Sequence, residues 1–275
     1  MSFISSNYTS LGLKMLYTNA EVIFSCASAF IQAIGSDRFF DIKEYRRCLS
    51  EVFSLSIQEK SFSINFEDSS VSKSLLSSPS IAENIVQILP TDVSERKVIA
   101  RNILDALTSL NKTFPSFSPI IELQVAHIVV AKNTRYGSGT TSKYPAYIWL
   151  SPSQDWEIFD YAECLYHEIV HLNLFLIDMV YGLYRDRSVL YDTAYYSKSV
   201  IKKVKRPIDK SFHSICVADS LVNFFEHYGK HDEAQSMKNE LLETIRECIY
   251  MQNGLSDIGK QIIRDIEERY NITTP

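Results

Sequence analysis

The chain has 275 residues, of which 45% are hydrophobic and 22% are charged, so it is long enough to bury a sizeable core as one domain or two smaller ones. Its formal net charge of -5 gives no overall attraction to nucleic acid or to an anionic membrane surface, and we expect neither as a partner. The five cysteines are scattered and form no CxxC pair, which is typical of reduced thiols in a cytoplasmic protein.

The first third of the chain is predicted to be helical. Apolar residues recur at steps of three and four over residues 9–34 and 40–58, and Gly35 with its polar neighbours breaks the run between them. The first run contains polar residues such as Lys14 and Glu21, and no basic segment precedes it. It therefore predicts neither a signal peptide nor a membrane span, in keeping with a cytoplasmic location.

A serine-rich stretch, residues 61–80, is the best candidate for a loose connection or a boundary between subdomains, and serines at helix starts explain some of these residues equally well. After it, residues 92–111 have the period of another helix. We therefore expect a helical N-terminal region over residues 1–115 and a second domain over residues 116–275, which carries the candidate site. One continuous globule is the alternative.

After this predicted helix, the sequence pattern changes from that of helices to that of strands. Residues 121–131, IELQVAHIVVA, place apolar side chains at alternate positions, which predicts a strand. Residues 133–145 resemble a hairpin loop, and residues 146–150, AYIWL, predict a second strand. His127 lies on the apolar face of the first strand, where we expect a core histidine and not a ligand. Helices return from Pro207 onward, so the predicted fold class is mainly α with a small antiparallel β-sheet (α+β).

The segment CLYHEIVHLNLF, residues 164–175, contains His167, Glu168 and His171 in the order HExxH on a predicted long central helix. Residues four apart lie on one face of a helix, so the two imidazoles can reach one metal ion, and Glu168 can reach a metal-bound water or orient a ligand. The alternative is a core helix with two satisfied histidines. Burying these three polar groups is costly without a partner, and a metal ion is the simplest partner.

The third metal ligand distinguishes the possible classes of protein. The metzincin pattern HExxHxxGxxH is excluded, because Leu174 and Ile177 occupy its last two positions. A thermolysin-like site needs a downstream glutamate, and none lies between Glu168 and Glu226. We favour His213, which opens a helix apolar enough to pack against the motif helix. The other candidates are Asp178, Asp192, Asp209, His227, His231 and Glu168 itself, with His227 and His231 expected at an exposed helix end.

A lysine-rich run, SKSVIKKVKRPIDK over residues 197–210, precedes His213. We expect its lysines to lie in a solvated loop. Arg206 differs by position, because it immediately precedes Pro207 at the start of a predicted helix. A guanidinium at that point can bind a carboxylate through two parallel hydrogen bonds.

The segments LYHEIVHLNLFLID and RPIDKSFHSICVADSLVNFF resemble the 2-oxoglutarate-dependent HExxH-type peptide β-hydroxylases. The resemblance covers about residues 146–265, includes AYIWLSP, and leaves out the first 110 residues. It implies a fold unlike the cupin and an iron(II)-dependent enzyme that hydroxylates a side-chain β-carbon of a ribosomally made precursor peptide. It further implies that His167, His171 and His213 bind Fe(II), that Arg206 binds the distal carboxylate of 2-oxoglutarate, and that Glu168 acts within the catalytic site.

Two other functions stay open on the residues alone. One is a zincin-like zinc metallopeptidase with Glu168 as general base, and the other is a non-catalytic peptide-binding domain. A hydroxylase needs open metal positions for the keto acid and O2, with an apolar wall that we expect from Leu165, Leu172 and Ile215. Under either chemistry we expect residues 146–150 to form an edge strand on which an extended peptide lies. The peptide, the modified residue and the oligomeric state are not indicated by the sequence.

Overall fold

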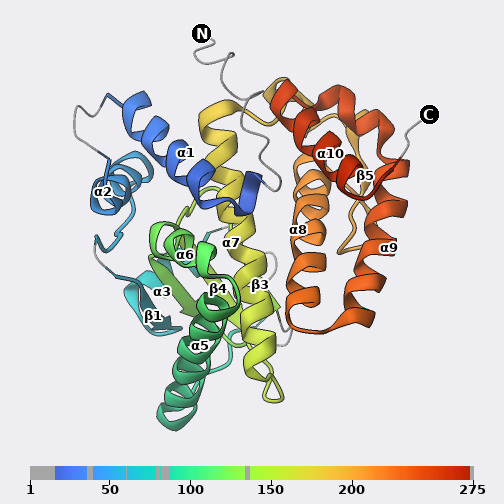
Figure 1. Cartoon of the computed structure of the whole chain (residues 1–275). Helices are drawn as coiled ribbons and strands as arrows, with labels where there is room; N and C mark the ends of the chain where they lie inside the picture. Colours follow the sequence, from blue (N-terminus) through green and yellow to red (C-terminus); the bar gives the residue numbers. More distant parts are fainter. Residues whose placement is uncertain are drawn as a thin grey trace.

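The computed structural model describes residues 16–35, 40–59, 61–78, 81, 87–133 and 137–272. Figure 1 shows a mainly helical molecule in which the long helix α7 (Ile158–Tyr181) runs through the middle. The N-terminal helices and a small sheet lie on one side of α7, and the C-terminal helices lie on the other side (Figure 1). The prediction of a mainly helical chain with a small sheet is confirmed.

Helices precede and follow α7 in the chain, and they include two that were not predicted, Ser70–Leu76 and Ser118–Gln124. Those before it are α1 (Ala20–Ala33), α2 (Ile42–Phe53), α3 (Ser70–Leu76), α5 (Val93–Thr113) and α6 (Ser118–Gln124). Those after it are α8 (Ile208–His227), α9 (His231–Glu247) and α10 (Asp257–Arg269). Short 3-10 helices occur at η1 (Leu16–Thr18), η2 (Pro115–Phe117), η3 (Arg187–Leu190), η4 (Thr193–Tyr195) and η5 (Ile249–Gly254). The helix predicted over residues 9–34 begins at Ala20, and residues 9–15 lie outside the described residues.

Helix α7 has a defined start and a defined end. Glu157 and Asp160 form a reciprocal capping box at its start, in which each side chain accepts from the backbone N–H of the other residue. The helix ends at Gly182, whose φ of +71° favours glycine. Between these ends half of the α7 residues are buried, because α1, α5, α8 and the sheet pack around the helix. Among the described residues, no helix is both long enough and apolar enough to cross a membrane.

Among the described residues, the main sheet has four strands in the order β1-β2-β4-β3. They are β1 (Ser63–Phe66), β2 (His127–Val130), β3 (Gly137–Gly139) and β4 (Tyr147–Ser151). The pairs β1–β2 and β2–β4 are parallel, and only β3–β4 is antiparallel. The prediction of an antiparallel sheet is therefore wrong. So is the prediction that residues 146–150 form an edge, because β4 lies between β2 and β3.

Two local sequence patterns explain these differences. The first half of the alternating stretch forms α6, with Pro119 in its first turn, so the strand itself is only His127–Val130. This strand is buried on both faces, and an internal strand of that kind needs no polar alternation. The serine-rich stretch is not a loose connection either. It contains β1 and then α3, whose start is capped by Ser69 through a 3.0 Å hydrogen bond from the Ser72 backbone N–H.

The two faces of the sheet lie against different cores. Ile148 and Leu150 of β4 belong to the main hydrophobic core, together with the buried residues of α7. Tyr147 and Trp149, which alternate with them, belong to a smaller core that includes Leu75 of α3. Successive residues of β4 therefore contact different cores. Ile148 and Leu150 lie on the face of the sheet that packs against α7.

The main core joins both halves of the chain. It includes residues as early as Ile23 of α1 and as late as Ile266 of α10, and β1 pairs with β2 across the expected division near residue 115. The division into residues 1–115 and 116–275 stays a prediction. The shared core and the shared sheet favour its alternative, one continuous globule.

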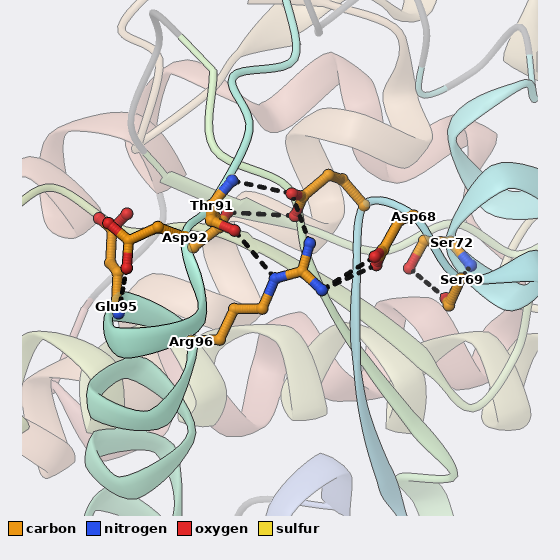
Figure 2. Close-up of polar contacts among 8 residues, drawn as sticks. Asp68, Ser69, Ser72, Thr91, Asp92, Glu95 and Arg96 are labelled. Atoms are coloured by element: carbon orange, nitrogen blue, oxygen red, sulfur yellow. Dashed lines mark hydrogen bonds and ion pairs between the residues drawn. The ribbon is translucent and has the colours of Figure 1, made fainter.

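A surface network fixes the start of α5 against the end of β1. Arg96 donates to Glu67 at 2.9 Å, to Asp68 at 2.9 Å and to the Thr91 carbonyl at 3.0 Å. Figure 2 shows the guanidinium between these groups, with Thr91 also donating to Glu67. The Arg96 hydrogen bonds hold the pKa of the Asp68 carboxyl below its usual value. Arg96, Glu67 and Asp68 each have a partner within this network. We therefore interpret it as a structural contact and not as a binding site.

A buried network connects the N-terminal segment to the C-terminal helices. Tyr17 of η1 donates its hydroxyl to Asp219 of α8, and Arg269 of α10 pairs with the same carboxylate. The side-chain amide of Asn173 in α7 donates to the Tyr17 carbonyl at 2.7 Å. Tyr17, Asn173 and Asp219 are each at most 1% exposed. A carboxylate at that depth needs such partners, because an unpaired buried charge is strongly destabilising.

Removal of the Tyr17 hydroxyl tests this network. We expect Tyr17→Phe to lower the free energy of unfolding by about 1–3 kcal/mol, because Asp219 loses a hydrogen bond to its buried charge. The matched control is Tyr45→Phe, which removes a buried hydroxyl whose hydrogen-bond partner among the described residues is the neutral Gln124, at 3.3 Å. Urea unfolding followed by circular dichroism measures both. A loss for Tyr17→Phe no greater than that for Tyr45→Phe would contradict this account.

Candidate metal centre

Helices α7 and α8 carry the candidate ligands and pack side by side. His167, Glu168 and His171 lie near the middle of α7, and His213 lies near the start of α8. Glu168 is 2% exposed and His213 is 6% exposed, whereas the His167 side chain keeps 22% of its surface exposed. Glu168 and His213 therefore lie inside the protein, whereas His167 and His171 are each partly exposed.

The structure brings His171 and His213 into direct contact. Their Nδ1 atoms are 3.0 Å apart and their rings are stacked, with centroids 5.2 Å apart. One nitrogen can donate to the other, or both can bind one ion. Two nitrogens at about 2.0–2.1 Å from an ion, at an angle near 90–110°, lie roughly 2.8–3.4 Å from each other. The spacing of this pair thus fits two ligands of a single metal ion.

His167 lies one turn before His171, with ring centroids 5.0 Å apart. Its Nε2 atom is 3.8 Å from Oε1 of Glu168. Within residues 16–272, leaving aside the gaps given above, no three histidine, cysteine, aspartate or glutamate side chains are positioned to hold one metal ion together. The chemistry of the donors, three imidazoles with one carboxylate, fits iron(II) or zinc(II). The three-ligand site stays a prediction, and the contact between His171 and His213 is its observed part.

Burial decides the protonation of these groups. It lowers the pKa of His167 to about 4, with a further contribution from the charge of Lys202. It lowers the pKa of His213 to about 3, with a contribution from Lys210, and it lowers that of His171 well below its usual value. The histidines are therefore neutral at pH 7, which is the form that binds metal ions.

Glu168 is anchored to the edge of the sheet. The hydroxyl of Ser138 in β3 donates to its Oε1 atom at 2.7 Å. Burial raises the pKa of Glu168 to about 8, and the Ser138 hydrogen bond and the charge of Lys202 act in the opposite direction. The carboxyl group next to the first histidine is thus held in place by a strand and not by another helix.

An aromatic ring adjoins the histidine pair. Phe175 lies one turn after His171 on α7, with its ring centroid 6.3 Å from that of His171 and 5.1 Å from that of His213. The residues expected to form an apolar wall, Leu165, Leu172 and Ile215, are buried in the main core. Their role at the site stays a prediction, whereas the contact of Phe175 with both rings is observed.

Arg206 is half-buried in a two-stranded hairpin, β5 (Ser197–Lys198) and β6 (Lys205–Arg206), just before α8. The predicted lysine-rich loop is therefore a hairpin. In the part of the chain that the structure describes, no hydrogen bond or ion pair engages the Arg206 guanidinium. Its charge contributes to the lowered pKa of His171, after burial, the other two histidines and Lys210. The positive charges of Lys202, Arg206 and Lys210 thus act on the histidine cluster.

The other candidate ligands lie in structural contacts or at the surface. Asp178 accepts from the Leu183 backbone N–H at 2.8 Å and pairs with Arg187 at 3.1 Å, so it closes the end of α7. Asp192 caps η4 through the Ala194 N–H. The remaining members are Asp209, which is 3.7 Å from Lys210, and His227 and His231, which are exposed as predicted.

His127 is a core histidine, as predicted. It is 2% exposed, and its two ring nitrogens lie 2.7 Å from the Ser56 carbonyl oxygen and 2.8 Å from the Ser63 hydroxyl. Both nitrogens therefore have partners within the fold. This histidine needs no metal ion to satisfy its polar atoms.

Sequence reasoning missed two residues that contact the site. Phe175 follows His171 by four positions, so helical spacing alone places it on the same face. Ser138 had no such signal, because it lies in a stretch that resembles a hairpin loop and 30 positions before Glu168. Its contact depends on how β3 joins the sheet.

Comparison with known proteins adds no identification. No protein-family model and no curated protein matches the sequence.

The contact between His171 and His213 predicts shared metal binding. We expect the metal-free protein to bind one Zn(II) or Co(II), and we expect His213→Ala to weaken that binding by at least about 100-fold, since one ligand is lost. Isothermal titration calorimetry measures the affinity, and the visible spectrum of Co(II) reports its coordination. The control is His227→Ala on the same helix, which should bind as the wild type does. Unchanged affinity in His213→Ala would exclude this histidine as a ligand.

Proposed function

We propose that this protein is an iron(II)- and 2-oxoglutarate-dependent hydroxylase that acts on a side-chain β-carbon of a ribosomally made precursor peptide. The observation that carries the proposal is the 3.0 Å approach of His213 to His171 of the HExxH motif. The first of these residues comes from the segment RPIDKSFHS and the second from LYHEIVHLN, the two segments on which the resemblance to the peptide β-hydroxylases rests.

In this proposal the histidines of α7 and α8 hold the metal. His171 and His213 are its inner ligands, and His167 completes the set from the more exposed side. Bound iron(II) supplies the redox chemistry by which 2-oxoglutarate, O2 and a C–H bond become succinate, CO2 and an alcohol. Three protein ligands leave positions for the keto acid and O2.

Glu168 and Phe175 have positioning roles in this proposal. Ser138 fixes the Glu168 carboxyl group beside His167, where it can orient that imidazole or a bound water. The ring of Phe175 covers the contact between His171 and His213 and excludes water from that side. A dry wall of this kind protects a reactive oxidant from side reactions.

Arg206 supplies the carboxylate-binding group. It stands seven residues before His213, at the point where the β5–β6 hairpin leads into α8. Its guanidinium has no protein partner among the described residues, so a bidentate contact with a dicarboxylate breaks no existing ion pair. The free carboxylate of 2-oxoglutarate matches that geometry, whereas a peptide bond undergoing hydrolysis brings no such charge.

Succinate formation tests the enzyme class without knowledge of the peptide. The metal-free protein is reconstituted with Fe(II) under argon, supplied with O2 and 2-oxoglutarate, and assayed for succinate by mass spectrometry. We expect slow uncoupled turnover that His171→Ala and His213→Ala abolish and that Zn(II) does not support. A stoichiometric Zn(II) protein that cleaves peptides and makes no succinate would overturn the proposal in favour of the metallopeptidase.

Arg206→Met tests the carboxylate-binding role. We expect the KM for 2-oxoglutarate to rise by about 10- to 100-fold with little change in kcat, because a charged pair is lost at a group remote from the reacting carbon. Succinate formation at a series of 2-oxoglutarate concentrations gives both constants. The control is Arg264→Met, on the outer surface of α10, which should change neither. An equal KM in the two variants would assign Arg206 no role in binding the cosubstrate.

A further inference from the structure

Strand β3 forms the outer edge of the main sheet beside the candidate site. Its inner side pairs with β4 in the register Gly137–Ser151, Ser138–Leu150 and Gly139–Trp149. Among the strands that the structure describes, none pairs with its outer side, and all three of its residues are half-buried. An edge of this kind presents backbone N–H and C=O groups that another extended chain can bind.

The register decides which residue of β3 faces the site. Residues directly opposite across a ladder lie on the same face of a sheet. Ser138 is opposite Leu150, which faces the main core on the α7 side, and the Ser138 hydroxyl accordingly reaches Glu168 at 2.7 Å. Gly139 is opposite Trp149, which faces the smaller core on the other side. Position 138 is therefore the position of β3 that points toward the site.

Ser138 has a glycine on each side, Gly137 and Gly139, so it is the one residue of β3 that carries a side chain. A Cβ atom on Gly139 would lie 2.3 Å from Nε1 of Trp149, so the indole packed beneath the strand requires glycine there. Gly137 has a φ of +143°, which L residues rarely adopt. Glycine within a strand is typical of places where a second backbone approaches closely.

We propose that β3 binds the substrate peptide as an added extended strand, and that the peptide residue opposite Ser138 is the residue presented to the metal. Its neighbours along the peptide point to the opposite face of the sheet, so only one residue in two faces α7. The choice of this residue as the one modified rests on the hydroxylase function proposed above, whereas the binding of the strand does not.

This arrangement also explains why the proposed hydroxylation takes place at a β-carbon of the peptide. Backbone pairing fixes the Cβ atom of the opposite residue at roughly 4.5–5.5 Å from Cβ of Ser138, whatever its side chain is. Atoms further along the side chain vary with residue type and rotamer, and the Cβ atom does not. A site built next to a pairing strand therefore acts most uniformly on β-carbons, with the modified position set by register.

Peptides for the test come from selection on the protein itself. A display library of random dodecapeptides is selected on the immobilised full-length chain without iron or 2-oxoglutarate, and the tightest peptides are synthesised. Each backbone nitrogen is then methylated in turn. We expect affinity losses of at least about 10-fold at alternate residues within the short stretch that pairs with β3, and small effects at the other residues, since only alternate N–H groups of an added strand point to β3. Losses without this alternation would overturn the proposal.

A disulfide trap locates the peptide on the protein. The variant Ser138→Cys, made in a Cys164→Ser background because Cys164 lies close to Ser138, is mixed with single-cysteine versions of the selected peptide. We expect one peptide position to cross-link fastest, with weaker reaction two residues away. The control is Ser74→Cys in the same background, on the exposed side of α3. Absence of any peptide that cross-links preferentially at position 138 would overturn the proposal.

The outcomes for this proposal and for the enzyme class are separable. Alternation and cross-linking at position 138 in a protein that makes no succinate would retain the strand site and remove the hydroxylase. Succinate formation by a protein whose peptides show neither signature would retain the hydroxylase and remove the strand site.

Discussion

Polar side chains of helix α7 need hydrogen-bond partners inside the protein, and the elements that supply these partners are packed around the helix. Glu168 accepts from Ser138 of β3, His171 contacts His213 of α8, and the Asn173 amide donates to the η1 backbone. These three residues lie within two turns of one helix, and each one contacts a different element. Unpaired, each would cost more free energy than most apolar contacts return, so the sheet edge, α8 and the N-terminal segment are all held against the same short stretch of helix.

The same need for buried partners fixes the position of α7 relative to α8, the two helices that carry the candidate ligands. α7 meets α8 directly at His171 and His213, and it meets α8 again through a chain of hydrogen bonds from Asn173 to Tyr17 and from Tyr17 to Asp219. Arg269 of α10 pairs with Asp219, the last residue of this chain of hydrogen bonds. Two separate connections between a pair of helices limit both sliding and rotation. A metal site whose ligands come from different helices depends on such rigidity, because small displacements change its coordination.

The parts that could be predicted from sequence are those set by local patterns. Helical period placed α5, α7 and α8, and spacing along the chain identified the HExxH motif. His213 was favoured because it opens a helix apolar enough to pack against the motif helix. The sheet was mispredicted, because the apolar alternation over residues 121–131 extends into α6 and because parallel pairing is fixed by distant residues. Ser138 could not be foreseen for the same reason. Its place next to Glu168 depends on the register of β3 on β4, and no property of the loop sequence encodes it.

The pairing of β1 with β2 has a consequence for how the chain acquires its structure. Ser63 lies opposite His127, so this pairing joins residues more than sixty positions apart, with α3 and α5 between them in the chain. A fragment beginning at residue 116 would contain every candidate ligand, yet it would leave one side of β2 without its partner strand and open to other chains. In the whole chain, β1 of the N-terminal region covers that side of β2.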